Sequence, residues 1–94
     1  MSAFYAAKGG IVAFTKSLAR EVGSFGITVN AVSPGQVVNK TMSVEEAKAV
    51  KDSETSVGRP GTSGDIATAI LFLVSEEAGF ITGDVLNVTG GWLI

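Results

Sequence analysis

The segment ITVNAVSPG, residues 27–35, decides the fold class of this chain. Its first seven residues are mostly apolar or β-branched, which is typical of a strand buried on both faces, and Pro34-Gly35 stops the strand. A second short run of this kind, DVLNV, occupies residues 84–88. Because helical segments separate the two runs, we expect a right-handed crossover between parallel strands and hence an α/β fold.

Two long helices are predicted around these strands. Apolar residues recur at spacings of three and four between positions 5 and 22 and predict an amphipathic helix there. These residues are Ile11, Phe14, Leu18 and Val22, and we interpret them as core or as a subunit interface. A capping-box pattern over residues 62–65 begins a second helix that ends near residue 77.

The region between these helices, residues 36–61, is polar and is expected to form mostly irregular loops. A second capping-box pattern, over residues 43–46, predicts a short helix from about Val44 to Lys51 within it. Three single polar residues receive structural interpretations. We interpret Arg59 as a loop anchor, Asp65 as a helix cap and Asn30 as a partner for buried backbone groups.

The composition excludes several classes of function. The chain of 94 residues contains no cysteine and no histidine, so it offers no disulfide framework, thiolate metal site or imidazole ligand. Its net charge of -2 without a basic stripe argues against nucleic acid, and no signal peptide or bilayer-spanning run is found. We therefore expect a cytoplasmic protein with no metal site, no nucleic-acid partner and no membrane partner.

Tyr5 and Lys8 lie one helical turn apart at the start of the first predicted helix. A lysine ammonium beside a phenol favours the phenolate, and so helps the phenol to donate a proton to a carbonyl oxygen. This pair is the candidate catalytic site. The alternative interpretation is an exposed tyrosine in a frayed first turn.

Eight strings follow one another along the chain. They are Tyr5 with KGGI at 8–11, LARE at 18–21, ITVNAVSPG at 27–35, GRPG at 58–61, DIA at 65–67, LFL at 71–73, ITG at 81–83 and NVTGGW at 87–92. In this order and spacing they resemble the second half of a short-chain dehydrogenase/reductase. Any one string is a weak signal, but the combination is specific and covers nearly the whole chain.

The resemblance implies a fold, an activity and a set of site residues. The fold is the C-terminal part of a Rossmann-like, doubly wound parallel sheet, here a single partial domain over 1–94 with two short strands, two long helices and one short helix. The activity is oxidoreduction of carbonyl or alcohol substrates with NAD or NADP. Tyr5 and Lys8 would be catalytic, with Lys8 also binding the nicotinamide ribose, and Pro34, Gly35 and Val37 would contact the nicotinamide end.

The sequence departs from the family pattern in three places. It contains no glycine-rich phosphate turn after a strand, so this chain alone is expected neither to bind NAD or NADP nor to be active. The family tyrosine lies four residues before its lysine, where this chain has Phe4, whereas Tyr5 lies three before. Either Phe4 replaces the catalytic tyrosine or one residue has been lost. The family threonine falls near position 39, and in this chain Asn39 and Thr41 flank that place.

Two parallel strands alone are not a stable sheet, and an open apolar edge recruits another chain. In the family, the helix with the Tyr–Lys pair also packs against its own copy. We therefore expect a homo-oligomer, a dimer or a tetramer, in which elements can be rearranged or swapped; pairing with a missing N-terminal half or with a full-length relative is the alternative. Two functional hypotheses remain: a truncated dehydrogenase/reductase, and a non-enzymatic oligomerisation module derived from one.

Overall fold

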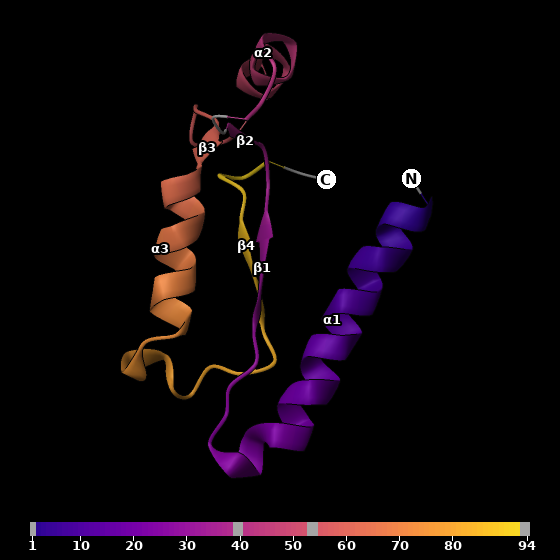
Figure 1. The fold of residues 1–94 in the computed structure, drawn as a ribbon, viewed down its shortest axis with the longest axis vertical. Coiled ribbons are helices and arrows are strands. Elements are labelled where there is room, and N and C mark those ends of the chain that lie inside the picture. The colour runs from indigo at the N-terminus through magenta and orange to yellow at the C-terminus, as the bar shows by residue number, and fades with distance from the viewer. Residues whose placement is uncertain (1, 39–40, 53–54, 93–94) are drawn as a thin grey trace. The chain divides into compact units, whose positions relative to one another are not determined.

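The computed structural model describes residues 2–38, 41–52 and 55–92, so Asn39 lies outside the described residues. The elements, in chain order, are α1 (Ser2–Val22), a 3₁₀ helix (Gly23–Phe25), β1 (Ala31–Pro34), β2 (Val37–Val38), α2 (Val44–Asp52), β3 (Gly61–Thr62), α3 (Ser63–Leu73), a second 3₁₀ helix (Glu76–Ala78) and β4 (Val85–Val88) (Figure 1). The chain divides into two compact units, residues 1–31 with 71–86 and residues 32–70 with 87–94. No helix in the described ranges is long and apolar enough to cross a membrane.

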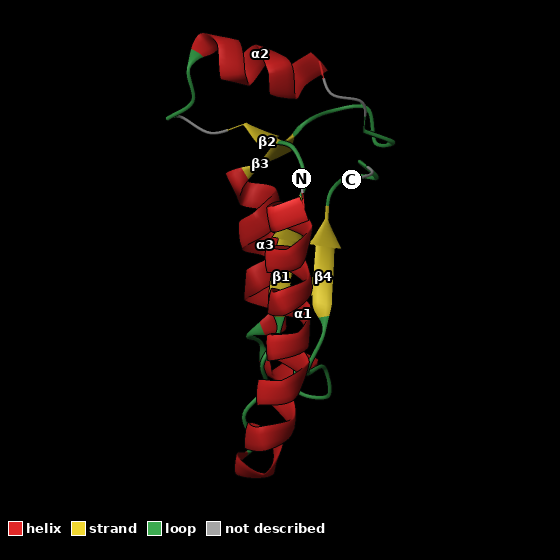
Figure 2. Ribbon diagram, turned by 90° about the vertical axis from the view of Figure 1, so that its right-hand side faces the viewer, coloured by secondary structure: helices red, strands yellow, loops and turns green. Residues whose placement is uncertain are grey.

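The two predicted strands are β1 and β4, which lie side by side in Figure 1 and pair in a two-stranded sheet; β4 is the yellow arrow that is seen in full in Figure 2. The Ala31 N–H donates to the Asp84 carbonyl at 2.9 Å, and the Gly35 N–H donates to the Val88 carbonyl at 3.1 Å. Both partners advance along the chain in the same direction, so the strands are parallel. The α/β class and the parallel pairing predicted from the crossover are therefore confirmed.

The first strand is shorter than predicted, because regular pairing begins at Ala31 rather than at Ile27. Just before it, side chains take over the role of the ladder. The Val29 N–H donates to the Thr82 hydroxyl at 3.0 Å, and the Asn30 side-chain amide donates to the Ile81 carbonyl at 3.1 Å. These side-chain bonds satisfy the backbone without a regular strand.

A second ladder, between β2 and β3, was not predicted from the sequence. It is parallel, with Val37 opposite Gly61 and Val38 opposite Thr62. Two residues on each side are too short for an alternating pattern to be visible, so the sequence indicated irregular loops here. The expectation for residues 36–61 was wrong at this ladder, whereas the predicted short helix is present as α2.

The side of α1 that packs within its own unit coincides only in part with the predicted stripe of large apolar residues. Thr15 and Ala19 are buried, whereas Ile11 is 56% and Phe14 66% exposed. The turn at Gly83 packs against this side of the helix, where a Cβ at Gly83 would lie at ordinary contact distance, 3.5 Å, from the Ala19 Cβ. Leu18 and Val22 are half-buried, so the second half of the predicted stripe is partly packed, whereas the interface interpretation remains for the exposed Ile11 and Phe14.

Capping interactions set the start of α2 and of α3 as the sequence predicted. The Ser43 hydroxyl accepts a hydrogen bond from the Glu46 N–H at 3.0 Å at the start of α2. The second long helix ends earlier than predicted, at Leu73. The Ser75 hydroxyl donates to the Phe72 carbonyl at 2.5 Å, and a 3₁₀ helix follows.

Asn30 is expected to contribute strongly to stability, because its side chain has two backbone partners. Its amide donates to Ile81, and its side-chain oxygen accepts from the Asp84 N–H at 3.1 Å, which confirms the structural interpretation of this residue. Asn30→Ala should lower the free energy of unfolding by about 2 kcal/mol in urea titrations. Thr28→Ala, at an exposed neighbouring position, is the control and should change it by less than about 0.5 kcal/mol. Equal effects would contradict this role.

Candidate functional site

Tyr5 and Lys8 both lie in the first turns of α1. Tyr5 is 51% exposed, and its ring meets the ring of Phe4 edge-on, with centroids 5.6 Å apart. The Lys8 ammonium lies 6.0 Å from the centroid of the Phe4 ring, within the range of a cation–π contact. Phe4, four residues before Lys8, therefore contacts the lysine through its ring face and has no hydroxyl to donate.

Pro34, Gly35 and Val37 lie at the carboxyl end of β1 and in β2. In doubly wound sheets ligands bind at this end of the strands. Gly35 approaches the end of β4 so closely that a Cβ there would lie 2.9 Å from the Thr89 Cα. Packing against β4 therefore explains the glycine, without any ligand. Val37 is fixed by its pairing with Gly61.

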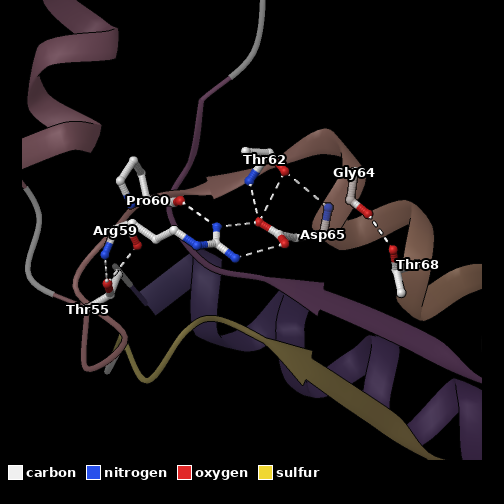
Figure 3. Close-up of polar contacts among 7 residues, drawn as sticks. All are labelled: Thr55, Arg59, Pro60, Thr62, Gly64, Asp65 and Thr68. Atoms are coloured by element: carbon white, nitrogen blue, oxygen red, sulfur yellow. Dashed lines mark hydrogen bonds and ion pairs between the residues drawn. The ribbon is translucent and has the colours of Figure 1, made fainter.

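An ion pair between Arg59 and Asp65 lies in the same compact unit (Figure 3). Arg59 Nη1 donates to Asp65 Oδ2 at 2.7 Å, and Nη2 donates to Oδ1 at 3.1 Å, so the pair is bidentate. The Thr62 N–H also donates to Asp65 Oδ2, at 2.8 Å. Arg59 and then Thr62 hold the pKa of the Asp65 carboxyl well below its ordinary value of 3.8, and the same pair raises the pKa of Arg59.

Asp65 also caps α3, in a reciprocal capping box with Thr62. Its own N–H donates to the Thr62 hydroxyl at 3.2 Å, while the Thr62 N–H donates to its carboxylate. The predicted roles of Asp65 as a cap and Arg59 as a loop anchor are confirmed. The sequence did not reveal that the two residues bind each other, because the chain between them carries no pattern that brings an arginine back to a cap.

Two hollows among the described residues can be compared with a coenzyme site. One, of about 280 Å³, is lined by residues that include Arg59, Asp65 and Gln36, and is below the usual size of ligand pockets. The other, of about 710 Å³, is lined by α1 residues from Lys16 onward and by the turn at Gly83. Neither lining includes Tyr5, Lys8, Pro34, Gly35 or Val37. These hollows therefore do not fit a dinucleotide held at the predicted residues.

The five predicted site residues are divided between the two compact units. Tyr5 and Lys8 belong to the unit with residues 1–31, and Pro34, Gly35 and Val37 belong to the unit with residues 32–70. Tyr5 and Lys8 each contact the Phe4 ring, and Pro34, Gly35 and Val37 are neighbours along the chain. Over the described ranges, the acidic side chains form no cluster of three or more that could hold a metal ion.

Comparison with known proteins finds relatives that match almost the whole chain. A family model described as enoyl-(acyl carrier protein) reductase matches residues 1–93. The chain is 49% identical over 90 residues to the 3-oxoacyl-(acyl-carrier-protein) reductase FabG of Haemophilus influenzae, covering 94% of this chain and 37% of that protein. It is 46% identical over 93 residues to the putative oxidoreductase YtkK of Bacillus subtilis, covering 96% of this chain and 36% of that protein.

A solved structure is also similar. The crystal structure of acetoin dehydrogenase YohF from Salmonella typhimurium matches with a TM-score of 0.79 and 35% identity. The match covers 97% of this chain and 37% of that one. The chain thus spans little more than a third of the length of the relatives it matches.

Proposed function

Because this chain belongs to the short-chain dehydrogenase/reductase family, we propose that it supplies the C-terminal part of an NAD(P)-dependent oxidoreductase acting on carbonyl or alcohol groups. The observation that carries this proposal is the match of the family model to residues 1–93. Curated relatives named as reductases are 44–49% identical over almost all of the chain. This chain spans only 37% of the length of those relatives, so the activity of this chain is part of the proposal.

Within such an enzyme, we assign Lys8 to the family's lysine position and proton donation to Tyr5. Two facts support this choice. Tyr5 is the only tyrosine of the chain, and Phe4 in the four-residue position has no hydroxyl. Pro34, Gly35 and Val37 are assigned to the nicotinamide end of the coenzyme, because they follow the carboxyl end of a parallel strand.

The residues present do not fit a whole dinucleotide. The sequence offers no glycine-rich turn for the pyrophosphate. The space beside Gly35, which a coenzyme could otherwise approach, is filled by the backbone of Thr89. We therefore propose that this chain alone neither binds NAD or NADP tightly nor catalyses hydride transfer. The coenzyme would be held only together with residues that this chain does not contain.

Nicotinamide fluorescence tests this part of the proposal directly. The chain at about 10 µM should give no saturable change in the emission of NADH or NADPH up to about 1 mM coenzyme. This concentration is high enough to reveal a complex with a Kd in the micromolar range. Saturation with a Kd in the micromolar range would show that the chain holds the coenzyme by itself, and would contradict the proposal. Reading the coding sequence upstream of Met1 tests the rest: an in-frame G-x-x-x-G-x-G would support an oxidoreductase.

A second candidate function is a non-enzymatic oligomerisation module. The exposed stripe on α1 favours it, because Phe4, Ile11 and Phe14 are each about half exposed or more and share one face. We propose that this exposed face pairs with its counterpart in a second copy, in a dimer or a tetramer. The three residues Phe4, Ile11 and Phe14 are called the α1 stripe. A full-length relative could present the same face. The absence of cysteine fits a cytoplasmic location, which we also propose.

A further inference from the structure

The turn from Pro34 to Val38 is held by its neighbours through backbone hydrogen bonds. On one side, the Gly35 N–H donates to the Val88 carbonyl at the end of β4, at 3.1 Å. On the other side, the Gly61 N–H donates to the Gln36 carbonyl at 2.8 Å, and β2 pairs with β3. Because β3 has only two residues, its own position must be fixed by something outside the ladder.

A single carboxylate fixes both ends of β3. Beyond its last residue, Asp65 accepts hydrogen bonds from the Thr62 N–H at 2.8 Å and from the Thr62 hydroxyl at 3.1 Å. Before its first residue, Arg59 binds the same carboxylate through both Nη atoms, and Arg59 Nη1 also donates to the Pro60 carbonyl at 3.1 Å (Figure 3). The chain entering β3 and the chain leaving it are thus closed into one loop around Asp65.

The arginine end of this loop is itself held in place. The Thr55 hydroxyl donates to the Arg59 carbonyl at 2.7 Å and accepts from the Arg59 N–H at 3.1 Å. Between Thr55 and Arg59, the Val57 N–H donates to the carbonyl of Gly90, a residue beyond the end of β4, at 3.1 Å. The segment that carries Arg59 is therefore attached to the chain that follows β4.

We propose that Arg59 and Asp65 are positioning residues whose bidentate ion pair sets β3, and through β3 the Pro34–Val38 turn. The claim that this turn faces the coenzyme rests on the proposed function; the positioning itself does not. The pair is partly solvent-exposed, with side-chain exposures of 57% and 32%, so its contribution is geometric more than energetic. A guanidinium fork can hold two carboxylate oxygens at fixed angles, whereas a lysine ammonium cannot.

Amide hydrogen exchange of the intact chain, read residue by residue by NMR, tests this inference. Arg59→Lys keeps the charge and leaves the capping box in place, and should make the Gly61 amide exchange about five-fold faster. The Ala31 amide, which donates to Asp84 in the other compact unit, should change less than about two-fold. Arg20→Lys is the matched control, because it makes the same change at an exposed site on α1 and should leave Gly61 unchanged.

Asp65→Asn is the second variant and should accelerate Gly61 exchange more than Arg59→Lys does, because it removes the negative charge both from the ion pair and from the first turn of α3. If both variants keep native circular dichroism and leave Gly61 exchange unchanged, the positioning role is wrong. If Asp65→Asn unfolds α3, the Arg59→Lys result decides. The measurement uses no coenzyme, so a failure of the proposed oxidoreductase function would leave the exchange result standing, and failure of the exchange result would leave that function untouched.

Discussion

Gly35→Ala is expected to lower the free energy of unfolding by about 2 kcal/mol, the middle of the range for overpacking a tight contact. The added methyl group would lie 2.9 Å from the Thr89 Cα and 3.2 Å from the Thr89 carbonyl oxygen. These are backbone atoms at the end of β4, so no side-chain rotation can relieve the clash. Relief requires β1 and β4 to separate at this end, which breaks the hydrogen bond between Gly35 and Val88.

The matched control is the same substitution in α1. Gly9 has no atom within 4 Å of the place where its Cβ would lie. Gly9→Ala should therefore raise the free energy of unfolding by up to about 1 kcal/mol, since alanine favours a helix more than glycine does. In urea titrations at one protein concentration, the unfolding midpoints of the two variants should shift in opposite directions from that of the unmodified chain. A Gly35→Ala midpoint equal to or above that of the unmodified chain would show that the approach to Thr89 is not tight.

Phe14→Glu is expected to dissociate the proposed oligomer. Phe14 is 66% exposed in the isolated chain, and Ile11 on the same face of α1 is exposed as well. Burying a phenylalanine in an interface is worth about 2 kcal/mol, so its loss should weaken self-association about thirty-fold per interface. A buried unpaired carboxylate would weaken association further. Sedimentation velocity across a concentration series should show the variant as a monomer where the unmodified chain is a dimer or larger.

Ala13→Glu is the control for this experiment. Ala13 is exposed and lies about 100° around the helix from Phe14, on the side away from Ile11. It adds the same charge to the same helix, and the oligomer should persist. If the unmodified chain is a well-folded monomer at micromolar concentration, the proposed role of the α1 stripe is wrong. If both variants dissociate equally, the effect is due to net charge and not to the stripe.

In the candidate site, residues that stand together in the chain could be predicted from the sequence, whereas contacts that depend on how the chain folds back could not. Tyr5 with Lys8, and Pro34 with Gly35, could be proposed as site residues from the sequence because each pair is close along the chain and stands at a predicted helix or strand end. The pairing of Val37 with Gly61 and of Arg59 with Asp65 was not found. The first joins residues far apart in the chain, and the second needs the loop between them to fold back.

The sequence by itself determined the α/β class, the parallel strands, the helices and their caps, because periodicity, capping residues and turn residues act over a few neighbouring positions. Only the tertiary structure decided which side of α1 is covered. There Thr15 and Ala19 are buried instead of Ile11 and Phe14. The reason at Ala19 is the turn at Gly83, more than sixty residues away in the chain, which packs against this side of the helix: a Cβ at Gly83 would lie 3.5 Å from the Ala19 Cβ.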